Sequence, residues 1–486
     1  MKKIALLHFL LLTTIVFCQD RKISLDEAIQ LAQKKSPDFK ANLNKNQASY
    51  WRYKNYKASF LPIVGLSATL PSYSNSSRRL TNDLGQDIFV NQNQSRIEGR
   101  LSISQNIPYT GGSLSINSQL ERIDIFGANS STGYFVTPFS INYNQNSLFY
   151  NPFKWDKKIE PLIYEESKKD FIENMEKISL TTSRFYFSLL KSQMQLKIAN
   201  NNLSNQDTLY QIAKGRFKIG KIAENDLLQM ELSLLNSKNS VTTSKISLKR
   251  AAQNFTRYLG LGSQELELNI PVNLSPFNVD IEKALEEASS NRKSVIEFRR
   301  KRLEAEKELA RVKGNNKLQL NVNANFGISQ QGALINDLFQ DFNRQQNISV
   351  TLSLPVFDWG VSKSRRKIAE ANLDLVNTNL EQDKQAFEQE IYLHTLNWSN
   401  QRVFLKTSEK AKEIATKRYD ITKKRYILGK ITITDLNLAQ SEKDRAVVVY
   451  LNSLEKFWVD YYTLRRLTLY DFLNDKKIEI KDIIYN

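Results

Sequence analysis

Two stretches, GRFKIGKIAENDL at 215–227 and KRYILGKITITDL at 424–436, share one pattern of residues. Gly220 and Gly429 hold the same place in the two stretches, which sets the displacement between them at 209 positions. In each, a glycine is followed six positions later by Asp-Leu, as expected where a helix ends at a tip and a second helix returns. The chain is therefore predicted to contain two copies of one structural unit.

An earlier pair of motifs agrees with this duplication at a different displacement. ISLDEAIQLA at 23–32 resembles VDIEKALEEA at 279–288, and the shift from 23 to 279 is 256 positions. The first copy therefore holds about 47 residues more than the second, the difference between 256 and 209. These extra residues must lie between about 70 and 150, where the sequence is rich in Ser, Asn, Gly and aromatic residues. A linker containing Gly and Pro, at 260–276, separates the copies.

Several stretches are predicted to be helices. Over 362–425, which lacks Pro and Gly, apolar residues recur at steps of three, four or seven. At 1.5 Å per residue this helix would be about 95 Å long. The first copy offers a similar helix over 161–216, and its first residue is a proline suited to a helix start. Shorter helices are expected over 279–312 and 435–470, so each copy would form a helical hairpin.

Other stretches alternate between apolar and polar residues and are predicted to be strands. Their polar positions carry Ser, Asn and Gln almost without charge, which suits a confined, water-filled lumen, while the apolar positions suit lipid. A soluble antiparallel sheet whose apolar side is buried would alternate in the same way, so both interpretations stay open. The stretches are 318–329, 348–354, 139–144 and those that begin at Val64, Leu101 and Leu114. Aromatic residues suited to a lipid interface accompany them: Tyr134, Phe135, Phe149, Tyr150, Phe153 and Trp155.

Closure of such a sheet would decide the oligomeric state. Hydrocarbon cannot satisfy a free strand edge, so a sheet in a membrane must close on itself. The four to six predicted strands are fewer than the eight or so that the smallest single-chain barrels need. Several chains would therefore have to share one barrel.

Composition excludes several classes of function. The 486 residues include one cysteine, Cys18, and two histidines, His8 and His394, too few for a metal site built from several such ligands. His394 lies on the apolar seam of its predicted helix and is expected to be packed there. No phosphate loop or nucleophile elbow is present, so we expect neither catalysis nor a cofactor. The formal charge is +18, but Lys and Arg are spread along the helices, which argues against a nucleic-acid partner.

The amino terminus has the features of a secretory signal. Lys2 and Lys3 precede an apolar stretch at 4–17 that is too short to be an anchor. Cleavage after Cys18 would leave a mature chain that begins at Gln19 and has no cysteine. A lipid attached to Cys18 is the alternative. Export is expected in either case.

The order and duplication of these elements resemble the TolC family of outer-membrane efflux proteins. The motifs that carry the resemblance are LDEAI at 25–29, LP at 61–62, LPVFDWG at 354–360 and the two tips that end at Asp226 and Asp435. The resemblance implies a mixed α and β membrane protein that forms a homotrimer. Long antiparallel helical hairpins would form a periplasmic α-barrel tunnel, continued by a shared transmembrane β-barrel of twelve strands.

The implied division of the chain is a signal peptide at 1–18, a first repeat at 19–262 with an extra hairpin, a linker at 263–278, a second repeat at 279–470 and a tail at 471–486. The extra hairpin is expected near 97–125, because PYTGG at 108–112 is a turn signal between two alternating runs. It could join the barrel or lie outside it.

The resemblance also implies a function, that of a passive exit duct in a tripartite efflux or type I secretion system. An inner-membrane pump would supply the cargo through a periplasmic adaptor, so the chain itself would not be an enzyme. The cargo stays open, since small molecules, ions and proteins are all possible. The main alternative is a secreted or surface coiled-coil scaffold or adhesin without a pore, and a third is the periplasmic adaptor itself.

The same resemblance places functional residues at the two tips. Gly220, Lys221, Gly429 and Lys430 would form the tip turns and contact the adaptor, while Tyr426, Asp435 and Asp226 would form the gate at the periplasmic entrance. A ring of Asp residues in a narrow pore attracts cations. Either Asp could instead simply cap the returning helix. Leu438 stands where better-studied members can carry a second carboxylate, which argues against strong cation selectivity.

Overall fold

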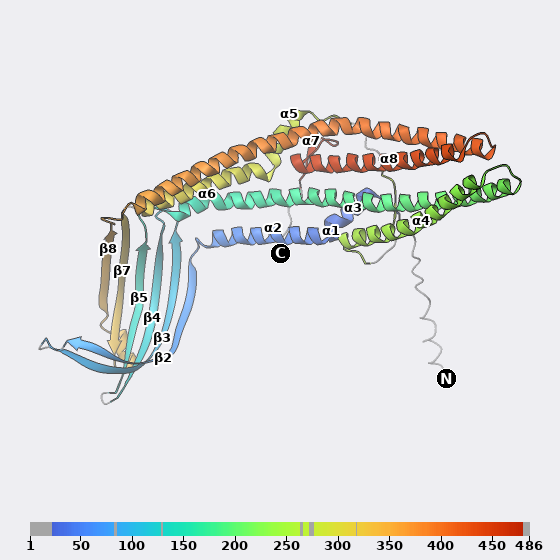
Figure 1. Cartoon of the computed structure of the whole chain (residues 1–486). Coiled ribbons are helices and arrows are strands. Elements are labelled where there is room, and N and C mark those ends of the chain that lie inside the picture. Colours follow the sequence, from blue (N-terminus) through green and yellow to red (C-terminus); the bar gives the residue numbers. More distant parts are fainter. Residues whose placement is uncertain are drawn as a thin grey trace, which may run out of the picture. The chain divides into compact units, whose positions relative to one another are not determined.

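The computed structural model describes residues 22–81, 85–127, 130–262, 266–271, 277–316 and 318–479 (Figure 1). The chain divides into two compact units, and each draws on both halves of the sequence. The first unit combines Met1–Asn46, Lys168–Arg292 and Ala386–Asn486, and the second combines Gln47–Ser167 and Lys293–Gln385. The predicted signal peptide and Cys18 lie outside the described residues, as do parts of the predicted linker and tail.

Two long helices, α3 (Pro152–Lys218) and α7 (Val361–Ile427), contain 67 residues each. Their first residues are 209 positions apart, the displacement of the tip motifs. Each is followed by a shorter returning helix, α4 (Glu224–Tyr258) or α8 (Ile433–Thr468), and these two also begin 209 positions apart. The helices predicted over 362–425 and 435–470 are therefore confirmed, and each of their observed ends lies within two residues of the predicted one. Among the helices described, none is both long and apolar enough to cross a membrane.

The prediction that the first long helix begins near Pro161 was wrong. The helix starts at Pro152, where a missing backbone N–H costs nothing because the first turn has no partner for it. The side chain of Asn151 caps this start, since its Oδ1 accepts a hydrogen bond from the Lys154 backbone N–H at 3.2 Å. Pro161 lies inside the helix and removes one of its backbone hydrogen bonds.

The single helix predicted over 279–312 is in fact two helices, α5 (Ile281–Asn291) and α6 (Lys293–Asn315). Arg292 between them has an extended backbone, and its guanidinium is held by Glu173 at 2.9 Å and Glu390 at 3.3 Å. These long-range partners could not be seen in the local sequence.

An equivalent break occurs near the amino terminus, between α1 (Leu25–Lys35) and α2 (Pro37–Ala58). Ser36 adopts the extended conformation there, as residues before proline commonly do. The two breaks, at 36 and 292, are 256 positions apart, which is the displacement of the amino-terminal motifs.

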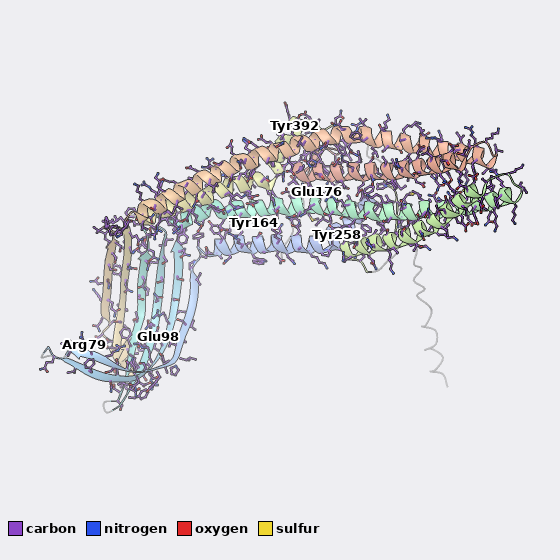
Figure 2. The ribbon with its side chains drawn as sticks, in the orientation of Figure 1. Arg79, Glu98, Tyr164, Glu176, Tyr258 and Tyr392 are labelled. Carbon is purple, nitrogen blue, oxygen red and sulfur yellow. The ribbon has the colours of Figure 1, made fainter. Side chains whose placement is uncertain are left out.

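The core of the first unit is built largely from aromatic residues. The indole of Trp398 lies 5.0 Å from the rings of both Phe277 and Phe457. A buried carboxylate of this unit is paired with a cation: the Glu176 side chain, on α3 in Figure 2, accepts hydrogen bonds from Arg465 at 2.9 and 3.1 Å. His394, predicted to be packed in the apolar seam, is only partly buried.

A six-stranded antiparallel sheet forms most of the second unit. Its spatial order is β2-β3-β4-β5-β7-β8 (Figure 1). The extra residues of the first copy form β3 and β4, so the predicted hairpin exists and lies in the interior of the sheet. The strands are β2 (Ile63–Thr81), β3 (Asp87–Ile107), β4 (Gly112–Phe126), β5 (Ser131–Gln145), β7 (Gln319–Gly332) and β8 (Asn343–Ser353).

The pairing register gives the sheet one apolar and one polar face. Residues directly opposite one another in neighbouring strands share a face. One row of such partners is apolar across five strands: Val64, Ile103, Ile116, Ile141 and Phe326. The adjacent row points to the other face and is small or neutral and polar: Gly65, Ser102, Asn117, Ser140, Gly327 and Gln345.

The apolar face is largely uncovered in the single chain. Leu66 on β2 is 80% exposed and Val350 on β8 is 60% exposed. Apolar surface of this extent normally marks a contact with lipid or with another protein. The alternative of a sheet whose apolar side is buried within its own chain therefore does not describe these strands.

The turn between β3 and β4 is fixed to the beginning of α3. Asn151 Nδ2 donates to the Pro108 carbonyl at 2.8 Å, and Gln145 Nε2 donates to the Thr110 carbonyl at 2.9 Å. Gly111 has a φ of +84°, which favours glycine. A Cβ on Gly112 would lie 2.6 Å from Gln145 Oε1 and 2.7 Å from the Asn144 carbonyl. The chain packs too closely here for any larger residue.

Replacing Gly112 with Ala should therefore lower the free energy of unfolding by about 1–3 kcal/mol, as overpacking commonly does. The measurement is a urea titration of both proteins. Gly133→Ala is the matched control, because a Cβ at that glycine of β5 would meet nothing within 4 Å. Equal effects of the two substitutions would show that the tight contact at the turn has no energetic importance.

Candidate functional site

The two tips have the same backbone geometry. Gly220 and Gly429 adopt φ values of +67° and +73°, in the left-handed region that favours glycine. In the first tip the Lys221 N–H donates to the Arg216 carbonyl at 2.9 Å, and in the second the Lys430 N–H donates to the Arg425 carbonyl at 3.0 Å. These hydrogen bonds close the last turns of α3 and α7. Both lysines are exposed, as are both glycines.

Asp435 occupies the cap of the returning helix α8. Its carboxylate accepts hydrogen bonds from the Thr432 N–H at 3.1 Å and the Thr432 hydroxyl at 2.7 Å, while Thr432 Oγ1 accepts from the Asp435 N–H at 3.2 Å. This reciprocal arrangement is a capping box. The hydrogen bonds from Thr432 hold the pKa of Asp435 below its usual value, and the charge of Arg425 lowers it further. The carboxylate is solvent-exposed.

Asp226 has a different environment from Asp435, although the two occupy equivalent positions in the tip motifs. It belongs to the first turn of α4, whose cap residue Ala223 offers no side-chain hydrogen bond. Asp226 is half-buried. Burial of the ring raises the pKa of Tyr426, the charge of Arg216 lowers it, and the charge of Asp226 raises it by a smaller amount. Of the two aspartates, only Asp435 takes part in a local capping box.

Tyr426 lies in a small apolar cluster that joins the two tips of one chain. Its side chain is buried beside residues of α3, α4 and α8. The members of this cluster, which we call the tip cluster, are Leu209, Ala213, Met230, Tyr419, Tyr426, Ile433, Leu436 and Ala439. Hydrogen bonds continue the contact away from the tips, including Asn202 to Asp444 at 2.6 Å and Lys423 to Asn205 at 2.6 Å.

Arg216 makes a polar contact at the ends of the two long helices, and it was not among the predicted site residues. Its Nη2 donates to the carbonyl of Ile427 at 2.9 Å, at the end of α7 where carbonyls lack helical partners. Its guanidinium also lies 5.5 Å from the centre of the Tyr426 ring, within range of a cation–π interaction. Arg216 and Arg425 hold the same place in the duplicated motif, and this was the only sequence signal that pointed to it.

The cap around Asp435 should weaken in acid. Because the folded state lowers the pKa of Asp435, the cap contributes stability above the unfolded pKa of about 3.9 and loses it as the pH falls through the lower folded value. Hydrogen–deuterium exchange, corrected for its intrinsic pH dependence, should show the first turn of α8 losing protection below about pH 4. Asp435→Asn is the control and should lack this step. The same step in both proteins would assign the effect to another group.

Comparison with known proteins adds to this picture. The model of the outer membrane efflux protein family matches residues 284–467. No curated protein sequence matches the chain. Among solved structures, the chain is similar to the CmeC outer membrane channel of Campylobacter jejuni, with 14% identity, a TM-score of 0.67 and coverage of 94% of this chain and 87% of that one.

Two further structures are similar to comparable extents. VceC, an outer membrane protein of Vibrio cholerae, has 13% identity and a TM-score of 0.64, over 94% of this chain and 97% of that one. The open state of the MtrE outer membrane channel of Neisseria gonorrhoeae has 12% identity and a TM-score of 0.61, over 94% and 91%. At these identities the likeness establishes the fold. With the family match over residues 284–467, it confirms the predicted resemblance to the TolC family of outer-membrane efflux proteins.

Proposed function

We propose that the chain is a passive outer-membrane channel, the exit duct through which an inner-membrane pump delivers its cargo to the exterior. The observation that carries this proposal is the register of the six-stranded sheet. Toward the helical end of the sheet, it collects exposed apolar side chains on one face and small or neutral polar ones on the other. Farther along, the polar face also carries the ion pairs Arg96–Glu121 and Arg100–Glu98. The first face suits contact with acyl chains and the second suits contact with water.

The polar face is chemically suited to conduction without specific binding. Asn142 and Asn325 lie directly opposite one another and are hydrogen-bonded through their side chains. Gln345 Nε2 donates to Ser329 Oγ at 2.6 Å on the same face. Neutral amides and hydroxyls that are paired with one another hydrate the face without holding an ion tightly. The selection of cargo therefore belongs to the pump, and no catalytic step, metal or cofactor is assigned to this chain.

Exposed aromatic residues at the helical end of the sheet support the same function. Tyr109, in the turn between β3 and β4, is 92% exposed, and Trp359, between β8 and α7, is 87% exposed. Phe149 and Phe357 are exposed at the same end. Amphipathic rings in such positions are typical of the interface between acyl chains and water. Of the six aromatic residues expected there from the sequence, Phe149 is the one that is strongly exposed.

The proposed assembly is a homotrimer with a shared β-barrel and a helical periplasmic tunnel, which receives cargo through a periplasmic adaptor. Two repeats, at 19–262 and 279–470, would supply equivalent parts of each wall. The matched lengths of α3 and α7 and the matched breaks at 36 and 292 support this duplication. The exposed Lys221 and Lys430 at the tips are proposed to contact the adaptor.

The gate is proposed to lie at the tips and to be held closed by the tip cluster. Arg216 hydrogen-bonds the end of α7 and contacts the Tyr426 ring, so the two tips of one chain are joined by both polar and apolar contacts. Asp226 lies in the first turn of α4, and Asp435 stabilises the start of α8. Opening would require these contacts to separate.

Conductance in planar lipid bilayers tests the proposal directly. Purified protein should insert and give discrete, long-lived current steps without any energy source. A secreted scaffold or adhesin would give none, and neither would a periplasmic adaptor. Failure of well-folded protein to conduct after reconstitution would overturn the proposed function.

Replacing Tyr426 and Asp435 together with Ala should raise the single-channel conductance several-fold. Truncation of the buried ring leaves a cavity in the tip cluster, a change that costs about 3–5 kcal/mol for large aromatic residues. Ile421→Ala is the control and should leave the conductance unchanged, because this exposed side chain of α7 is outside the tip cluster. Unchanged conductance in the double variant would count against a gate at these residues.

A further inference from the structure

We propose that all six strands of the sheet enter the barrel, so that three copies of this chain close it with eighteen strands instead of the twelve implied by the family resemblance. The inference rests on the proposed function and specifies the dimensions of its duct. The partner at each free edge of the sheet is a second copy of the same chain.

The hairpin β3–β4 cannot leave the sheet without breaking two long ladders. β3 pairs with β4 from Asn93↔Phe126 to Ile107↔Gly112, and β4 pairs with β5 from Ser113↔Asn144 to Ile125↔Ser131. The hairpin therefore lies between β2 and β5 along almost the whole length of β4. A barrel with only four strands per chain would have to break the backbone hydrogen bonds between β4 and β5 or those between β2 and β3.

The side chains of the hairpin match the faces of its neighbours. Ile103 and Ile116 lie in the apolar row that also contains Val64 and Ile141. Ser102 and Asn117 lie in the adjacent polar row. Only a hairpin within the wall of the barrel would place one face in lipid and the other in water, as the matching of its faces to the rest of the sheet requires.

The turn of the hairpin is integrated into the junction with the helices. Asn151 hydrogen-bonds the carbonyls of Pro108 and Tyr109 with one end of its amide, and its other end caps α3. On the neighbouring edge, Asn106 Nδ2 donates to the Ser59 carbonyl at 3.0 Å, which connects β3 to the segment between α2 and β2. At the helical end of the sheet the added strands are therefore anchored to the same junction as the others.

The number and direction of the strands allow a ring to close. Successive strands of the sheet are antiparallel, so the first, β2, and the sixth, β8, run in opposite directions. β8 of one copy can thus pair with β2 of the next in the antiparallel manner of the rest. Both strands are exposed along their length, and Leu66 and Val350 extend the apolar face to these edges. Repetition of one head-to-tail contact closes a cyclic assembly.

The perimeter of an eighteen-strand β-barrel matches that of the helical ring to which it would be joined. Four helical segments, from α2, α3, α6 and α7, belong to the second unit with the sheet, so three copies contribute twelve. At about 9 Å per packed helix their ring measures about 110 Å around. Strands about 4.8 Å apart and tilted by about 40° each take about 6 Å of perimeter, so eighteen span about 110 Å and twelve about 75 Å. Twelve strands would need a much steeper tilt to meet the same ring.

Disulfide cross-linking tests this arrangement. The described part of the chain contains no cysteine, so any disulfide formed there must involve the introduced cysteines. Leu66→Cys with Val350→Cys should give covalent dimers and trimers upon oxidation of the membrane-inserted protein. Cysteine at position 64 or 68 in place of 66 would test the neighbouring registers of the pairing between β2 and β8 of adjacent copies. Each single-cysteine variant should stay monomeric on a denaturing gel.

Two intrachain pairs establish whether the hairpin stays in the wall. Leu66 with Leu101, and Ile103 with Ile116, lie directly opposite one another and should cross-link within one chain in the same membranes. If β2 and β3 lay outside a twelve-strand barrel, the exposed edge would be β4, and Val350→Cys would instead cross-link to Ile116→Cys of the next copy. That result in a conducting protein would overturn the eighteen-strand barrel and leave the proposed function intact. Absence of both conductance and interchain cross-links would reject both.

Discussion

Lipid provides no hydrogen-bond partner for a strand edge, and in the proposed channel this constraint governs the second unit of the protein. Its sheet has two uncovered edges, β2 and β8, and an uncovered apolar face. Neither feature would be stable for one chain in water, because an open edge and an exposed apolar sheet both promote association. An assembly in which copies pair edge to edge within a membrane satisfies the edges and the apolar face together. The polar face is then enclosed and meets water.

In the proposed channel the helices of the first unit would meet a different requirement, that of holding an entrance closed while leaving it able to open. The tip cluster is small compared with the hydrophobic core that contains Trp398. Contacts of modest extent can separate without unfolding the rest of a protein. Arg216 illustrates the arrangement, because one side chain satisfies a carbonyl at the end of α7 and also contacts the Tyr426 ring. The duplicated glycines set the path of the chain at both tips and leave the contacts between tips to side chains.

Much of the fold followed from periodicity, because alternation with a period of two and helical seams are local properties. The tips and their displacement of 209 were read from the sequence alone, and the bounds of α7 and α8 agreed within two residues. The break at Arg292 was missed because it depends on Glu173 and Glu390, which are distant in sequence. The start of α3 was misplaced because a proline is acceptable both at the first position of a helix and, with the loss of one hydrogen bond, inside it. The different environments of Asp226 and Asp435 also depend on neighbouring residues. Thr432, three residues before Asp435, forms the capping box, whereas the equivalent residue before Asp226 is Ala223, which cannot.

The central claim is that water contacts one face of the sheet and lipid the other. Single cysteines placed at successive positions of β4, such as Ile116 and Asn117, can be tested with a charged, water-soluble thiol reagent in protein reconstituted into vesicles. Position 117 should react quickly and position 116 slowly, and the alternation should continue along the strand. Equal reactivity at neighbouring positions, or fast reaction of the apolar positions, would contradict the account.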